Sequence, residues 1–161
     1  MSTVVCNAGP LIALAGIGQL GILRDLFDVV FVAREVRNEV EAGGSKGAGA
    51  NLLSNAPWIQ QSDFQIRIDP LLESLLDKGE AATIALAIHS SASLILMDEL
   101  KGRRIARGIH GLAVIGTGRL LVEAKRANLI GEVRPLIDRM RSNGYWLSDR
   151  IVAEIARLAG E

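Results

Sequence analysis

The sequence has little cysteine, few aromatic residues and no long apolar run. Its single cysteine, Cys6, excludes an internal disulfide and a cysteine-rich zinc site, and it suits a reducing cytoplasm. Aromatic residues make up 4% of a chain that is 49% hydrophobic, so the core must consist mainly of aliphatic side chains. No apolar run approaches the roughly 20 residues of a membrane span, and the first residues lack the basic start of a signal peptide. We therefore expect a cytoplasmic protein with no membrane contact.

Acidic and basic residues balance in number but not in position. The chain carries 18 Lys and Arg and 18 Asp and Glu, which gives no net charge. Residues 1–100 hold 6 basic and 12 acidic residues, whereas residues 101–161 hold 12 basic and 6 acidic ones. A basic C-terminal part is a weak indication of a polyanionic partner. The length of 161 residues predicts a single domain over residues 1–161.

Short apolar runs alternate with segments of helical periodicity along the chain. The predicted strands cover residues 3–6, 29–32, 94–97 and 112–115, and most segments between them repeat apolar residues at helical spacing. No pair of strands shows the spacing of a β-hairpin. This alternation predicts an α/β fold, a three-layer α/β/α sandwich with a mostly parallel central sheet.

Four polar side chains occupy positions that indicate a common site. Asn7 and Asp98 directly follow predicted strands, and the carboxyl ends of parallel strands form the ligand-binding edge of a sheet. Glu39 and Glu80 fall on the apolar stripes of predicted helices, where an unpaired buried carboxylate is costly. Oxygen ligands with no His or Cys nearby favour a hard cation, Mg²⁺ or Mn²⁺. A salt bridge for Glu39 and simple placement by the helix dipole for Glu80 remain the alternatives.

A cluster of basic residues follows Asp98 within a few positions. Glu99 comes next and could assist Asp98, and Lys101, Arg103 and Arg104 lie on the helix that begins there. Guanidinium groups beside a metal site are suited to holding a phosphate of a nucleic acid. The alternative is a solvated helix face that carries ordinary surface charge.

The remaining aromatic and histidine side chains are interpreted as structural. Trp58, Tyr145 and Trp146 are predicted to pack in the core rather than to stack on nucleobases. His89 and His110 have no partner at metal-ligand spacing and are predicted to lie on helix surfaces.

Several segments, in order, resemble PIN-like proteins. Residues 4–14 (VVCNAGPLIAL) are similar to the opening of that family, in which the first strand ends in an acidic or Asn residue followed by a small residue, Pro and Leu-Ile. The resemblance continues at residues 79–87 (GEAATIALA), 96–99 (LMDE), 114–117 (VIGT) and 121–125 (LVEAK). The matching segments span nearly the whole chain. They resemble an uncharacterised prokaryotic branch of the family that is related to the toxins of toxin–antitoxin pairs.

The resemblance implies a ribonuclease that depends on Mg²⁺ or Mn²⁺. By position, Asn7, Glu39, Glu80 and Asp98 would form the acidic quartet that holds the metal, with Glu99 as a helper. It also implies RNA as substrate, a small antitoxin protein as partner and a homodimer. The family's first acid is usually Asp, and the amide of Asn7 can bind Mg²⁺ but brings no charge and cannot act as a base. The alternative function is therefore a catalytically silent module that binds RNA or a protein partner.

Overall fold

The fold is a parallel sheet covered by helices on both faces. The computed structural model describes residues 2–43, 51–62 and 65–161. Its strands are β1 (Thr3–Cys6), β2 (Val29–Val32), β3 (Ile59–Gln61), β4 (Leu94–Leu96) and β5 (Val114–Ile115), in the order β3-β2-β1-β4-β5. Every pairing between neighbouring strands is parallel. The predicted α/β sandwich with a mostly parallel sheet is therefore confirmed, although β5 is shorter than the predicted strand at residues 112–115.

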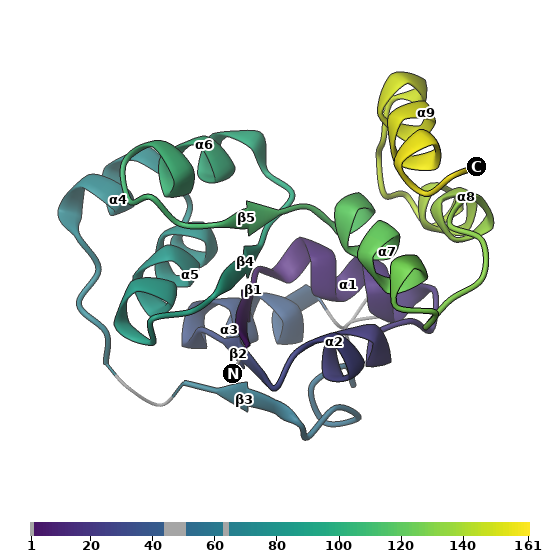
Figure 1. Cartoon of the computed structure of the whole chain (residues 1–161). Helices are drawn as coiled ribbons and strands as arrows, with labels where there is room; N and C mark the ends of the chain where they lie inside the picture. The colour runs from purple at the N-terminus through teal and green to yellow at the C-terminus, as the bar shows by residue number, and fades with distance from the viewer. Residues whose placement is uncertain (1, 44–50, 63–64) are drawn as a thin grey trace.

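Figure 1 shows the helices in layers around this sheet. The side that carries α5 also carries α4 and α6, whereas α1, α2 and α7 lie on the opposite side. The helices are α1 (Ala8–Gly16), α2 (Gly21–Leu26), α3 (Arg34–Gly43), α4 (Pro70–Leu75), α5 (Lys78–His89), α6 (Leu100–Gly108), α7 (Thr117–Arg126), α8 (Arg134–Ser142) and α9 (Asp149–Leu158). No described helix has the length and apolar content that crossing a membrane requires.

Helix α5 is the central helix of the fold. Its residues from Gly79 to Ala87 are all buried, and it packs on β1, β4 and α3. Four alanines in this run keep the helix narrow enough for close packing. A capping box fixes its first turn: the Asp77 carboxylate accepts a hydrogen bond of 2.8 Å from the Glu80 amide, and the Asp77 amide donates back to Glu80 Oε1 at 3.4 Å. The beginning of α5 is thereby held at the carboxyl edge of the sheet.

Helix α9 packs against α7, and α8 packs against α1 and α9. A Cβ at Gly118 would clash with the Ile155 side chain, so the glycine permits the close approach of α9 to α7. The Glu161 carboxylate accepts hydrogen bonds from the Val133 amide (2.7 Å), the Arg134 amide (3.0 Å) and Lys125 Nζ (2.9 Å). These contacts tie the end of the chain to the start of α8.

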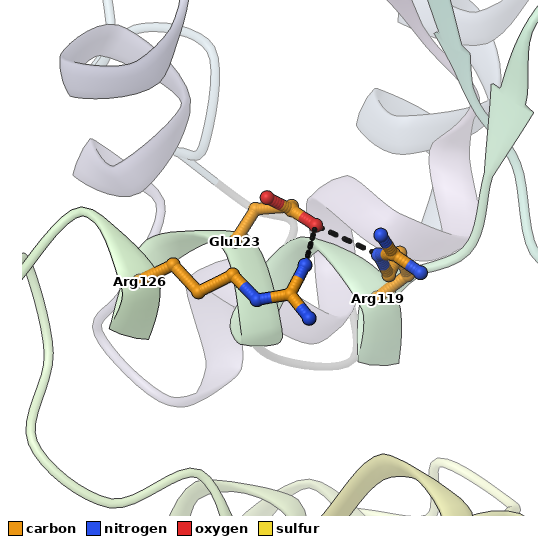
Figure 2. Close-up of polar contacts among 3 residues, drawn as sticks. All are labelled: Arg119, Glu123 and Arg126. Atoms are coloured by element: carbon orange, nitrogen blue, oxygen red, sulfur yellow. Dashed lines mark hydrogen bonds and ion pairs between the residues drawn. The ribbon is translucent and has the colours of Figure 1, made fainter. Parts of the chain in front are cut away.

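Much of the basic charge in the C-terminal part is already compensated. On the outer face of α7, Glu123 Oε1 accepts from Arg119 Nε at 2.8 Å and from Arg126 Nη1 at 2.9 Å, as Figure 2 shows. Arg141 pairs with Asp149 at 3.0 Å. Exposed pairs of this kind contribute only about 0.3–0.5 kcal/mol each. These pairs neutralise part of the excess of basic residues after residue 100.

Candidate metal site

Asn7 contributes a buried amide oxygen without a partner. The residue follows β1 and occupies the N-cap position of α1, but its side chain does not cap that helix. Its backbone amide donates to Leu96 O at 3.0 Å, which ties the ends of β1 and β4 together. Asn7 is 8% exposed, and Oδ1 has no hydrogen-bond partner in the described part of the chain. Leaving such an atom without a hydrogen bond costs about 1–3 kcal/mol. A ligand bound at Asn7 Oδ1 would remove this cost.

Three side-chain oxygens border the space directly above Gly79, which only a residue without a Cβ leaves free. A Cβ built on this glycine would lie 2.8 Å from Glu39 Oε2, 3.5 Å from Asn7 Oδ1 and 3.6 Å from Asp77 Oδ1. The three side chains come from α3, from the end of β1 and from the cap of α5. Burial raises the pKa of Glu39, and the nearby charge of Asp77 raises it further. The three side chains that border this space therefore offer oxygen atoms as metal ligands, and none of the three carries positive charge.

Glu80 adds a further carboxylate next to this space. It is 7% exposed, and burial raises its pKa to about 7, with contributions from the hydrogen bond and charge of Asp77 and from the charge of Glu99. A Cβ at Gly102 would lie 2.9 Å from Glu80 Oε2, so the first turn of α6 closes over the carboxylate. We call Asn7, Glu39, Asp77 and Glu80 the acidic cluster.

Asp98 is held in place by hydrogen bonds from Thr117. Its Oδ1 accepts from the Thr117 amide at 2.7 Å, and its Oδ2 accepts from Thr117 Oγ1 at 2.8 Å. Burial raises the pKa of Tyr145, and the nearby negative charge of Asp98 raises it further. The carboxylate is thus fixed at the N-terminus of α7, where the helix dipole favours negative charge.

The predicted quartet is therefore divided between two neighbouring positions. Asn7 and Glu39 face Gly79 at the start of α5, and Glu80 follows that glycine but faces Gly102 of α6, whereas Asp98 lies at the end of the adjacent strand β4. Over the described ranges, no three Asp, Glu, His or Cys side chains gather as a group able to hold a metal ion. A cation at the acidic cluster would consequently depend on the amide oxygen of Asn7.

The predicted helper and phosphate-binding residues differ in exposure. Glu99 is the N-cap of α6, lies at the surface and makes no side-chain capping bond. Lys101 and Arg104 are exposed, but Arg103 is half-buried, and its Nε is buried without a hydrogen-bond partner among the described residues. A Cβ at Gly116 would lie 3.4 Å from Arg103 Nη1 and 3.0 Å from Asp98 Oδ1. Arg103 is thus the basic residue that approaches Asp98.

Three residues near the site were not predicted from the sequence. Asp77 was detectable, because an Asp three residues before a Glu at a helix start is typical of a capping box. Thr117 lies in the segment 114–117 that resembles the family, but the sequence did not indicate its bonds to Asp98. No local pattern indicated that Tyr145 lies near Asp98. The prediction that Trp146 packs in the core is wrong, because its side chain is 80% exposed.

A parallel sheet with acidic side chains gathered at its carboxyl edge is the architecture of a PIN domain. The chain belongs to the family described as DUF3368: PIN domain, which matches residues 3–161. PIN domains are generally nucleases and typically use divalent metals. No curated protein matches the chain.

Proposed function

We propose that this PIN domain is an endoribonuclease that hydrolyses RNA phosphodiesters with the help of Mg²⁺ or Mn²⁺. The observation that carries the proposal is the unpartnered, buried Oδ1 of Asn7, which borders the space above Gly79 together with carboxylate oxygens of Glu39 and Asp77. The toxin role, a small antitoxin partner and a homodimer are further predictions of the same proposal, and they rest on the resemblance of the sequence.

The donor set of the acidic cluster fits a hard divalent cation. All its members offer oxygen, and the raised pKa values of Glu39 and Glu80 reflect burial and the neighbouring charge of Asp77. A cation bound there would relieve that repulsion and satisfy Asn7 Oδ1. Asn7, Glu39 and Glu80 would hold it, with Asp98 and Glu99 alongside. When bound, such an ion supplies an activated water and neutralises the charge that develops on phosphorus.

The other residues of the site position the substrate. Arg103 places a guanidinium beside Asp98, where it can hold a phosphate through two N–H groups. Thr117 fixes the Asp98 carboxylate through two hydrogen bonds. Asn7 adds no charge and cannot accept a proton, so Glu39, Glu80 and Asp98 must supply the negative charge of the site. The missing negative charge at Asn7 is the observation that favours the second candidate function, a catalytically silent module that binds RNA.

Cleavage of single-stranded RNA in Mn²⁺ is expected to fall about 100-fold in Glu39→Gln, since removal of one catalytic charge costs roughly 3 kcal/mol. Glu39 makes no hydrogen bond to the described residues, so its exchange leaves the fold intact. Glu41→Gln is the matched control on the same helix, because Glu41 is exposed. Its cleavage rate is expected to stay within twofold of the wild type.

Two results would contradict the nuclease proposal. If metal-saturated wild type cleaves no RNA, the silent module is the correct function. If Glu39→Gln and Glu41→Gln cleave equally well, the acidic cluster is not the catalytic site.

Asn7→Asp is expected to bind Mn²⁺ about tenfold more tightly than the wild type, because cation affinity rises with ligand charge. In EDTA the same variant should unfold more easily, since the new carboxylate lies near Glu39 and Asp77. Calorimetric titration and thermal unfolding measure the two effects. Asn38→Asp adds the same charge at an exposed position of α3 and should change neither. Unchanged Mn²⁺ affinity in Asn7→Asp would remove Asn7 from the site.

A further inference from the structure

A cavity of about 390 Å³ lies at the carboxyl edge of the sheet, beside the ends of β2 and β3. Its lining residues come from the start of α3 directly after β2, from the segment that follows β3, and from α5. Ile66, Ile68 and Ala82 provide apolar surface, and arginine, glutamate, glutamine and serine residues provide polar groups. Ligands of open α/β sheets bind at this edge, and the volume is in the range of sites for small organic ligands. The cavity therefore has the size and the place of a ligand site.

A buried hydroxyl without a partner belongs to the wall of this cavity. Ser62 directly follows β3, and its amide donates to Val32 O at 3.0 Å, which fixes the residue beside the end of β2. Ser62 is 5% exposed, and its Oγ has no hydrogen-bond partner in the described part of the chain. Buried polar side-chain atoms are normally hydrogen-bonded. A polar ligand in the cavity would supply the bond that Ser62 lacks.

The described residues of the wall carry more positive than negative charge. Arg34 and Arg67 contribute guanidinium groups, whereas Glu35 contributes one carboxylate. Arg67 is exposed and makes no hydrogen bond or ion pair with any residue of the described ranges. The cavity also adjoins the N-terminus of α3, and Ala33, which precedes this helix, has no side-chain oxygen to cap it. Guanidinium groups and a helix N-terminus both favour an anion, and a phosphate group in particular.

The cavity adjoins the acidic cluster along two helices. On α3, Glu35 lines the cavity, and Glu39, four residues later, borders the space above Gly79. On α5, Ala82 lines the cavity three residues after Gly79. Residues three or four apart on a helix lie on one face, with about 5–6 Å between their Cβ atoms. An RNA strand with one phosphate at the acidic cluster would therefore bring a neighbouring nucleotide to the cavity.

We propose that this cavity is a subsite for the RNA nucleotide next to the one cleaved at the acidic cluster. Arg67, together with Arg34, would hold the phosphate of this nucleotide, and the Ser62 hydroxyl would hydrogen-bond to it. The apolar side of the cavity would cover the rest of the nucleotide. The proposal rests on the proposed function for the path of the strand, and it deepens that function by assigning a second contact region to the substrate.

Binding of a labelled 12-nucleotide single-stranded RNA of mixed sequence, measured by fluorescence anisotropy in EDTA, tests the subsite without cleavage. Arg67→Ala should weaken binding about tenfold, the effect of one lost hydrogen bond to a charged group. Ser62→Ala should weaken binding about fivefold, yet raise the Tm of the free protein by about 3 °C, because it removes a buried hydroxyl that has no partner. Arg150→Ala removes the same charge from the exposed surface of α9 and should bind within twofold of the wild type.

The cleavage assay separates this inference from the nuclease proposal. On a long RNA in Mn²⁺, Arg67→Ala should raise KM about tenfold and leave kcat unchanged. If the wild type binds RNA through Arg67 and Ser62 but never cleaves it, the subsite stands and the nuclease function fails. If the wild type cleaves RNA, and Arg67→Ala and Ser62→Ala bind and cleave it equally well, the nuclease function stands and the subsite is wrong.

Uridine monophosphate distinguishes a nucleotide of an RNA strand from a free nucleotide. The wild type should bind it at least 100-fold more weakly than the 12-nucleotide RNA, because the strand gains further contacts along the acidic edge. If uridine monophosphate binds as tightly as the RNA, and Arg67→Ala weakens both, the cavity holds a free nucleotide and its assignment to the RNA strand is wrong. If the wild type binds neither, the subsite is also wrong.

Discussion

The Mn²⁺ affinity of Gly79→Ala is expected to be at least tenfold lower than that of the wild type, and its rate of RNA cleavage about 100-fold lower, without loss of stability. A Cβ at this position would lie only 2.8 Å from Glu39 Oε2 and would fill the space that Asn7 and Asp77 also border. The methyl group would push the Glu39 carboxylate away and occupy the position between it and the Asn7 oxygen, so a cation held there would be lost. Because Gly79 lies in the first turn of α5 with ordinary helical geometry, alanine should stabilise the helix by about 0.5–1 kcal/mol.

Gly9→Ala is the matched control for this variant. Gly9 lies in α1, two residues from Asn7, and a Cβ there would meet no atom within 4 Å. Calorimetric titration with Mn²⁺ and thermal unfolding in EDTA are measured on both variants. Mn²⁺ affinity equal to that of the wild type in Gly79→Ala would show that the space above Gly79 is not the metal site. A fall in stability in EDTA would instead show that alanine disturbs the packing of α5.

The sequence sufficed for the fold because its patterns are local. Each predicted strand is a short apolar run, and the parallel arrangement follows from the helices between the runs. The same logic placed Asn7 and Asp98 at one edge of the sheet, and the hydrogen bond from the Asn7 amide to Leu96 O confirms that β1 and β4 end together. Helical periodicity likewise predicted that Glu80 faces inward, and Glu80 is 7% exposed on α5.

The orientation of the side chains could not be predicted in the same way. Asp98 follows its strand as expected, but its direction is decided by hydrogen bonds from Thr117. Glu39 is exposed as a residue although its helical position suggested burial. The exposure of Trp146 depends on how Tyr145 anchors an irregular link. Contacts of this kind arise from tertiary packing, which periodicity does not encode.

Wild-type protein in EDTA is expected to lose stability as the pH rises from about 4.5 to about 7. The pKa of Glu80 is raised from 4.5 to about 7 in the folded chain, chiefly by burial and then by Asp77. The folded state therefore binds this proton more tightly than the unfolded state. Below pH 4.5 both states are protonated, whereas above pH 7 the folded state must carry the buried charge. The free energy of unfolding should fall by up to about 3 kcal/mol across this range.

Glu80→Gln should remove that pH dependence. Without metal the variant should be more stable than the wild type, and with metal the wild type should be more stable than the variant. The amide oxygen can still accept from the Asp77 amide, so the capping box keeps this bond. At pH 8 in EDTA the variant should be more stable than the wild type by about 1–3 kcal/mol, because no charge is buried. With saturating Mn²⁺ the wild type should become the more stable protein, since only it offers the carboxylate to the cation. Urea unfolding at pH 5 and pH 8, with Glu41→Gln as control, measures both effects. An identical response to Mn²⁺ in wild type and Glu80→Gln would mean that the charge of Glu80 serves the cap of α5 and not a metal ion.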